Sequence, residues 1–228
     1  MPKIYGTIKT IRRIEMAKKK SINQQRQEAG ELQVGRKFGI TKIKKAIRKI
    51  DFERLLSFVS KNNYMNHPTK SKLKIAYTLL FCTGCRISEI LYFTKDDLAT
   101  IIKYEEISLN NSTKTKKPRL IRFSDEHIQL IKNIVPSEAG YLFKRNNTLA
   151  PMTITGLTTL CNNYIQIALG DLYSSHGFRR NMISTILRET GRVKAAQQHI
   201  GHISPITTAK YDTLEDDEIK NILNRAKW

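Results

Sequence analysis

Apolar residues recur at helical spacing over most of the chain, and this pattern is interrupted once. Between residues 106 and 123, two short segments alternate polar and apolar residues, as half-buried strands do. The polar, turn-like run 110–118 separates these segments, Glu106–Leu109 and Leu120–Phe123. The strongest helical stripes are Leu73, Ala76, Leu79 and Leu80; Ile154, Leu157, Leu160, Tyr164, Ile165 and Ala168; and Phe178, Met182, Ile183, Ile186 and Leu187. The sequence therefore predicts an α+β fold that is mainly α-helical, with a small antiparallel β-hairpin.

Positive charge is concentrated at the N-terminus. Residues 1–50 hold 15 Lys and Arg against 3 Glu, and the whole chain of 228 residues has a net charge of +20. Few apolar residues accompany this charge before residue 45. We expect a basic, partly helical N-terminal arm over residues 1–44 and a globular domain over residues 45–228.

An excess of this size favours a polyanionic partner, and nucleic acid is the first interpretation. An anionic membrane surface is the alternative, and the codon usage of an AT-rich genome would explain part of the lysine content. No apolar run approaches the roughly 20 residues that a membrane span needs. Cys82, Cys85 and Cys161 are too few for a disulfide framework, so we expect core thiols in a reducing compartment. The residues 1–20 have no apolar core of a secretory signal, although they loosely resemble a transit peptide.

Four short segments carry residues suited to phosphate chemistry. Thr83-Gly84-Cys85-Arg86-Ile87-Ser88-Glu89 places an arginine after a glycine, with a carboxylate three residues later. Lys114 lies on the basic hairpin tip. His176-Gly177-Phe178-Arg179 puts His and Arg on one helical face. Gly201-His202 is followed nine residues later by Tyr211.

Together these segments resemble the tyrosine recombinases, the phage integrase family, over about residues 45–228. The resemblance implies the catalytic domain of that family, which breaks and rejoins DNA at specific sites through a covalent 3′-phosphotyrosyl intermediate. Its catalytic residues would be Arg86, Lys114, His176, Arg179, His202 and Tyr211. Glu89 would orient Arg86 or His176. No cofactor or metal is implied.

The chemistry of the residues agrees with these roles. Arg86 and Arg179 can bind the nonbridging oxygens of a phosphodiester through charge-assisted hydrogen bonds. The hydroxyl of Tyr211, whose ordinary pKa is about 10, needs a base such as His176. His202 can donate to a nonbridging oxygen. Lys114 can protonate the departing 5′ oxygen, although Lys116 and Lys117 compete for this role on the same tip.

Double-stranded DNA is the expected partner. Low-specificity phosphate contacts are expected from the basic residues outside the catalytic set, namely Lys18, Lys19, Lys20, Lys116, Lys117 and Arg119. In the family, a C-terminal helix often docks into a neighbouring subunit, so we expect a homotetramer on DNA assembled through residues 214–228. Family members also usually carry an N-terminal core-binding domain of which the arm would be a reduced form. We expect an intracellular protein, not secreted, that lies with DNA in a bacterium, phage, plasmid or AT-rich organelle such as a plastid.

Three alternatives stay open at the level of the sequence. A type IB topoisomerase or a telomere resolvase would use a similar site. A truncated or inactive recombinase would only bind DNA. A basic structural protein, for example one bound to ribosomal RNA, would form no covalent adduct.

Overall fold

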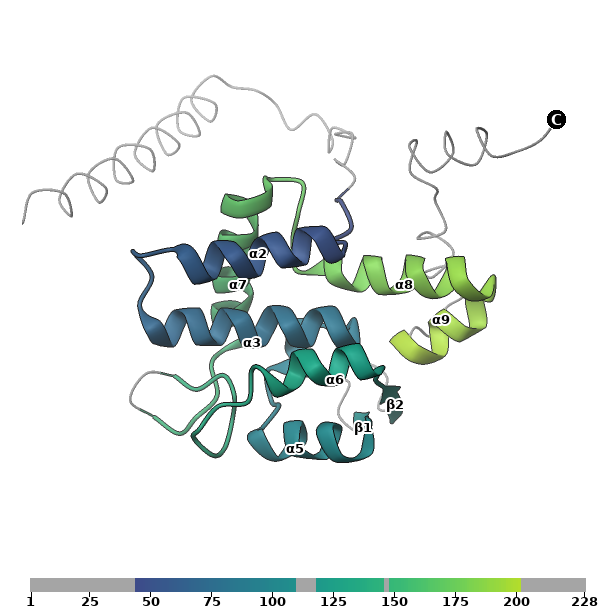
Figure 1. The fold of residues 1–228 in the computed structure, drawn as a ribbon, viewed down its shortest axis with the longest axis horizontal. Coiled ribbons are helices and arrows are strands. Elements are labelled where there is room, and N and C mark those ends of the chain that lie inside the picture. The colour runs from purple at the N-terminus through teal and green to yellow at the C-terminus, as the bar shows by residue number, and fades with distance from the viewer. Residues whose placement is uncertain (1–43, 110–117, 146–147, 202–228) are drawn as a thin grey trace, which may run out of the picture. The chain divides into compact units, whose positions relative to one another are not determined.

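The computed structural model describes residues 44–109, 118–145 and 148–201 (Figure 1). Their elements run in the order α2 (Lys49–Lys61), α3 (His67–Thr83), α4 (Ile87–Ile90), α5 (Lys95–Tyr104), β1 (Glu106–Leu109), β2 (Arg119–Arg122), α6 (Asp125–Lys132), α7 (Ile154–Leu169), α8 (His176–Thr190) and α9 (Val193–Ile200). The predicted mainly helical α+β fold with one small antiparallel sheet is confirmed.

Helix α3 is the centre of the core. It lies beside α2, with α7 behind the pair, and it also packs against α6 and α8 (Figure 1). Asn66 caps its first turn by accepting a hydrogen bond from the Thr69 amide at 3.0 Å. Its second half is buried on nearly every side, from Ile75 to Leu80. Because α3 is enclosed in this way, its C-terminal end is a fixed point from which functional residues can project.

The two strands form an antiparallel pair in which Glu106 lies opposite Arg122 and Leu109 lies opposite Arg119. Residues of β2 alternate between buried and exposed, so Arg119 and Ile121 face inward while Leu120 and Arg122 face outward. Helix α5, which immediately precedes β1, was not predicted. Its N-terminus is closed by Thr94 and Asp97, whose side chains and amides bond reciprocally.

Helices α8 and α9 pack on each other and form a small second core of Ile183, Leu187, Ala196 and Ile200. Gly191 ends α8 in the left-handed conformation, and Gly201 ends α9 in the same way at φ 73°. This turn leaves the carbonyl of Ile200 available to side chains.

The basic arm 1–43, the hairpin tip 110–117 and the segment 202–228 lie outside the described residues. The predictions for Lys18–Lys20, Lys114, Lys116, Lys117, His202 and Tyr211 therefore stay predictions, as does the arm–domain division near residue 44. Among the described residues, no helix is both long and apolar enough to cross a membrane.

Candidate active site around Arg86 and Arg179

Arg86 and Glu89 sit where α3 gives way to the short helix α4. Gly84 makes the turn with φ 60°, and a Cβ there would come within 2.9 Å of both Ile200 and Met182. The Arg86 amide donates to Glu89 at 2.7 Å, and its guanidinium Nη1 lies 3.3 Å from Glu89 Oε1. The Glu89 side chain is 3 % exposed, whereas that of Arg86 is 39 % exposed. The carboxylate is thus buried while the arginine beside it reaches the surface.

Arg179 enters the same site from α8. Its Nη1 donates to the carbonyl of Gly84 at 3.0 Å and its Nη2 donates to the carbonyl of Ile200 at 2.8 Å. Glu89 Oε2 is 3.9 Å from Arg179 Nη1. The Arg179 side chain is only 4 % exposed. Two backbone carbonyls therefore hold this guanidinium in place, and the carboxylate contacts it only at the limit of an ion pair.

Arg119, expected from the sequence to contact DNA, is buried in this site with a side chain that is 6 % exposed. Its Nη2 lies 2.9 Å from Glu89 Oε2 and 3.1 Å from Cys85 Sγ, and its Nη1 donates to the carbonyl of Ile200. The inward face of β2 explains the difference from the sequence prediction. Alternation with Ile121 places Arg119 on the buried side of the strand.

Positive charge exceeds negative charge within this cluster. Arg86, Arg119 and Arg179 converge on a single carboxylate, Glu89, which leaves two more cations than anions. Burial and the nearby charge of Arg86 lower the pKa of Arg179 to about 10, so it stays protonated at neutral pH. Uncompensated cations in a largely buried site favour binding of an anion that carries about two charges, or one that gains charge during reaction.

His176 begins α8, one turn before Arg179. Its side chain reaches the surface. Its pKa lies below the ordinary 6.5, first because part of the ring is buried, and then because Arg179, Arg86 and Arg180 are nearby. His176 is therefore neutral at physiological pH and can accept a proton.

The side chain of His199 is half-buried in the same region. Its Nε2 is buried and has no hydrogen-bond partner among the described residues. Burial and the positive charge of Arg119 lower its pKa to about 4. The reason for the burial is that α9 packs against α8 and β2.

The three cysteines are free and buried, which confirms the prediction of core thiols. Burial raises the pKa of each, to about 12 for Cys161. Neutral thiols of this kind are poor nucleophiles and metal ligands. Within the described ranges, no group of three or more His, Cys, Asp and Glu side chains is placed to hold a metal ion.

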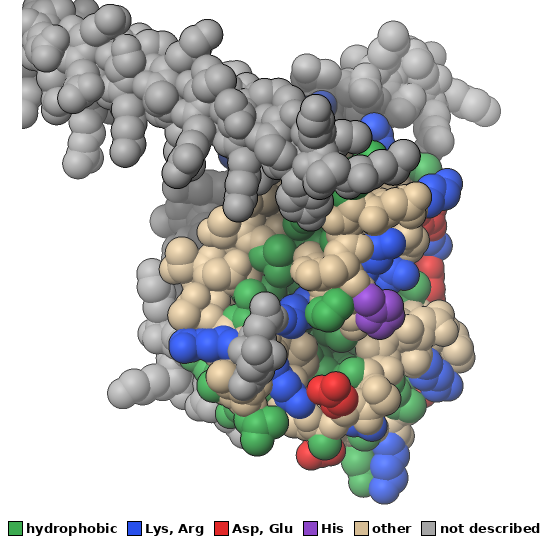
Figure 2. Space-filling model, turned by 90° about the vertical axis from the view of Figure 1, so that its left-hand side faces the viewer, with side chains coloured by type: hydrophobic (Ala, Val, Ile, Leu, Met, Phe, Trp, Pro, Cys, Tyr) green, Lys and Arg blue, Asp and Glu red, His purple; other side chains and the backbone are tan. Residues whose placement is uncertain are grey.

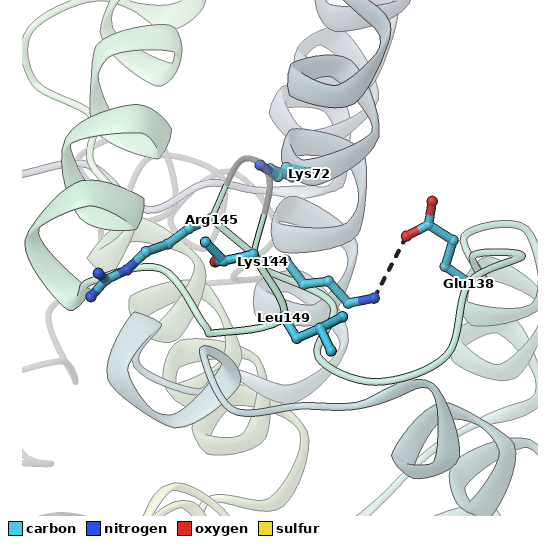
Figure 3. A pocket seen from close by; sticks show the side chains of 6 residues that line it. Lys72, Glu138, Lys144, Arg145 and Leu149 are labelled. Atoms are coloured by element: carbon cyan, nitrogen blue, oxygen red, sulfur yellow. Dashed lines mark ion pairs between the residues drawn. The ribbon is translucent and has the colours of Figure 1, made fainter.

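A cavity of about 460 Å³ lies elsewhere, between α3 and the loops around residues 138–149 (Figure 3). Lys144 points toward Glu138, 3.5 Å away, and donates to the carbonyl of Ala139 at 2.6 Å. Arg145 points away from Lys144 and donates to the carbonyl of Pro151 at 3.1 Å. Because these two cations hold the loop itself, the cavity is less suited to an anion than the arginine cluster.

The outer surface is also basic. On the face in Figure 2, Lys and Arg side chains lie on several sides of a central area where hydrophobic side chains reach the surface, and acidic side chains occupy few places. A surface of this kind attracts a polyanion toward the molecule over a distance of about 10 Å at moderate ionic strength.

The structure thus brings together four of the predicted site residues, Arg86, Glu89, His176 and Arg179, and adds Arg119. Gly201, the last residue that the structure describes, directly precedes His202 in the chain. A half-buried arginine and a buried one thus lie together, with a histidine one turn from the buried arginine, and their charge suits the binding of an anion.

The chain belongs to the phage integrase family, whose model matches residues 45–218. It is 25 % identical over 167 residues to tyrosine recombinase XerC of Treponema denticola, which covers 66 % of this chain and 54 % of that protein. Tyrosine recombinase XerD of Staphylococcus haemolyticus is 22 % identical over 156 residues, with coverages of 64 % and 52 %. The chain therefore spans about half the length of the curated relatives that it matches.

Solved structures show the same fold. The XerA recombinase superposes with a TM-score of 0.60 at 17 % identity, over 82 % of this chain and 67 % of that one. The XerH site-specific recombinase, in a post-cleavage complex with palindromic difH substrate, gives a TM-score of 0.60 at 18 % identity over 79 % of this chain and 52 % of that one.

Glu89→Gln should lower the free energy of unfolding by about 3 kcal/mol, because it leaves three buried or half-buried guanidiniums without an anion. Urea denaturation at neutral pH measures this change. The matched control is Glu106→Gln, which removes an exposed carboxylate 3.5 Å from Arg122 and should cost less than about 1 kcal/mol. Equal costs for the two variants would contradict a central role for Glu89.

Proposed function

We propose that the chain breaks and rejoins strands of double-stranded DNA, as a site-specific tyrosine recombinase with Tyr211 as nucleophile. The observation that carries this proposal is the excess of buried positive charge around Glu89. The charge of the Arg86 and Arg179 guanidiniums, which lie on the same carboxylate, supports binding of a phosphodiester and stabilisation of the additional charge of its transition state. Membership of the phage integrase family supports the same reaction.

In the proposed reaction, the Tyr211 oxygen attacks the phosphorus and the bond from phosphorus to the 5′ oxygen breaks. His176 accepts the phenolic proton or stabilises the phenolate, and Lys114 gives a proton to the departing 5′ oxygen. His202 donates to a nonbridging oxygen. The 3′-phosphotyrosyl bond conserves the energy of the phosphodiester, so a 5′ hydroxyl can reverse the steps and rejoin the strand without a nucleotide.

Binding to DNA would involve the basic residues outside the catalytic set, including Lys18–Lys20, Lys116 and Lys117, through phosphate contacts. The solved XerH complexes contain DNA substrates, which supports a duplex as the partner of this fold. We infer further that a homotetramer forms on DNA through residues 214–228. Sedimentation of the DNA-bound chain with and without this tail tests the assembly, and an unchanged mass would contradict it.

Tyr211→Phe should abolish covalent attachment to DNA, because phenylalanine lacks the attacking oxygen. A duplex with a nick near the scissile phosphate traps the adduct, since the short 5′ fragment diffuses away and cannot rejoin. The substrate carries the sequence that the full chain selects from a pool of random duplexes. A protease-sensitive band shift on a denaturing gel measures the adduct.

Tyr64→Phe is the matched control, because Tyr64 is exposed and lies outside the arginine cluster. It should form the adduct as the wild type does. An adduct formed by Tyr211→Phe would contradict the proposed nucleophile. DNA binding without any wild-type adduct would favour an inactive recombinase, and relaxation of supercoils without two-site recombination would favour a topoisomerase.

The rate of adduct formation should depend on the protonation of His176. The pKa of His176 in the fold is below 6.5, so the neutral base persists at neutral pH and is lost only as the pH falls below that value. Single-turnover rates between pH 5 and 8 should therefore fall on the acid side. His176→Asn should be slower at neutral pH and should lack this decrease. An identical acid limb in the two proteins would exclude His176 as its source.

A further inference from the structure

Arg119 is the most buried cation of the described site after Arg179, and the proposed reaction does not use it. We propose that Arg119 is a positioning residue: it occupies Glu89 and the last carbonyl of α9, and it thereby holds Arg86 and Arg179 in place for the scissile phosphate. This inference rests on the proposed function and assigns a role within the same site.

Arg119 connects three segments that are distant in the chain. Its side chain, on the first residue of β2, contacts Cys85 and Glu89 beside α4 and the Ile200 carbonyl at the end of α9. These partners are 34, 30 and 81 residues away from it. With 6 % of its side chain exposed and both terminal nitrogens bonded within the protein, Arg119 is held inside the site. Its placement therefore fits a supporting role better than the DNA contact expected from the sequence.

The two carboxylate oxygens of Glu89 contact all three arginines. Oε1 lies 3.3 Å from Arg86, whereas Oε2 lies 2.9 Å from Arg119 and 3.9 Å from Arg179. Arg119 is thus the closest of the three arginines to the carboxylate. Without it, Glu89 would attract Arg86 or Arg179 into a closer ion pair and reduce their ability to bind an incoming anion.

The Ile200 carbonyl is the second shared acceptor. It accepts from Arg119 Nη1 and from Arg179 Nη2, so the two guanidiniums are fixed relative to each other by one backbone atom. A Cβ on Gly201 would lie 2.9 Å from Arg119 Nη1 and 3.1 Å from its Cδ. The glycine therefore provides the space in which Arg119 approaches the end of α9, in addition to adopting a positive φ.

The planar guanidinium of an arginine can donate hydrogen bonds to these acceptors at the same time. The ammonium group of a lysine is a compact point charge on a shorter side chain. Arg119→Lys keeps the positive charge but loses the simultaneous hydrogen bonds to these acceptors. The variant therefore distinguishes a positioning role of Arg119 from a purely electrostatic one. Arg122→Lys is the matched control. It lies three residues along the same strand, its side chain is 76 % exposed, and it faces Glu106 at 3.5 Å.

The test measures three quantities for the full chain on the selected, nicked duplex: the dissociation constant of the DNA, the first-order rate of adduct formation, and the midpoint of thermal unfolding. Arg119→Lys should slow adduct formation on the order of 100-fold, the effect of a displacement of about 1 Å at reacting groups. The DNA dissociation constant should change by less than about threefold, because most of the binding comes from other phosphate contacts. Arg122→Lys should match the wild type in rate.

A second substrate carries a methylphosphonate at the scissile position, where a methyl group replaces one charged nonbridging oxygen. The neutral centre depends less on paired guanidiniums. If Arg119 acts through Arg86 and Arg179, the deficit of Arg119→Lys should shrink at least tenfold on this substrate. A deficit of the same size on both substrates, or a loss explained by unfolding alone at the assay temperature, overturns the proposal.

Hydrogen–deuterium exchange on the DNA-free chain tests the role of Arg119 without depending on the proposed reaction. If the wild type forms no adduct, the proposed function fails, and amide exchange at the end of α9 then decides whether Arg119 holds this turn. Arg119→Lys should speed exchange of the amides of residues 196–201 by about tenfold or more relative to Arg122→Lys. Equal exchange in the two variants overturns the positioning role.

Discussion

The buried carboxylate of Glu89 is the interaction on which the site depends. Burying one ion without partners would be costly, and burying the guanidiniums of Arg119 and Arg179 beside the half-buried Arg86 without an anion would be more so. Glu89 satisfies two of them closely and the third weakly, at 2.9, 3.3 and 3.9 Å. Removing the carboxylate would leave three cations to repel one another, so this single residue makes it feasible to concentrate arginines in the fold.

Backbone carbonyls at two helix ends provide the other contacts that hold the arginines. The C-terminal turn of α3 presents the Gly84 carbonyl, and the C-terminal turn of α9 presents the Ile200 carbonyl, because both helices end in a left-handed glycine. Carbonyls at helix C-termini are unpaired within the helix and carry partial negative charge, so they attract cations. Arg179 accordingly binds both of them. The site is thus built from two helix ends and one carboxylate, and the hairpin contributes Arg119 from β2.

Much of the fold and of the site could be predicted from the sequence, and the predictions that missed have physical causes. Arg86, Glu89, His176 and Arg179 occur in short local patterns, and the resemblance of these patterns to the tyrosine recombinases identified them as a set. Arg119 was predicted to contact DNA, although its alternation with Ile121 and Phe123 places it on the inward face of the strand. The burial of His199 depends on how α9 packs, which is a tertiary contact between segments distant in sequence. Helix α5 was missed although Thr94 and Asp97 form the reciprocal cap that marks a helix start.

The arrangement also explains why a site of this kind is prepared before its substrate arrives. Arg179 is held by carbonyls, which fix its orientation without neutralising its charge, and Arg119 takes the nearer oxygen of Glu89. The remaining positive charge is a cost to folding, since burial, followed by the charge of neighbouring arginines, lowers the pKa of Arg179 and of His176. In the proposed reaction, an entering phosphate would offset this charge, and it would do so more strongly as the phosphorus centre gains negative charge in the transition state. Under the proposed function, a fold that tolerates this uncompensated charge would therefore stabilise the transition state by charges that are already in position.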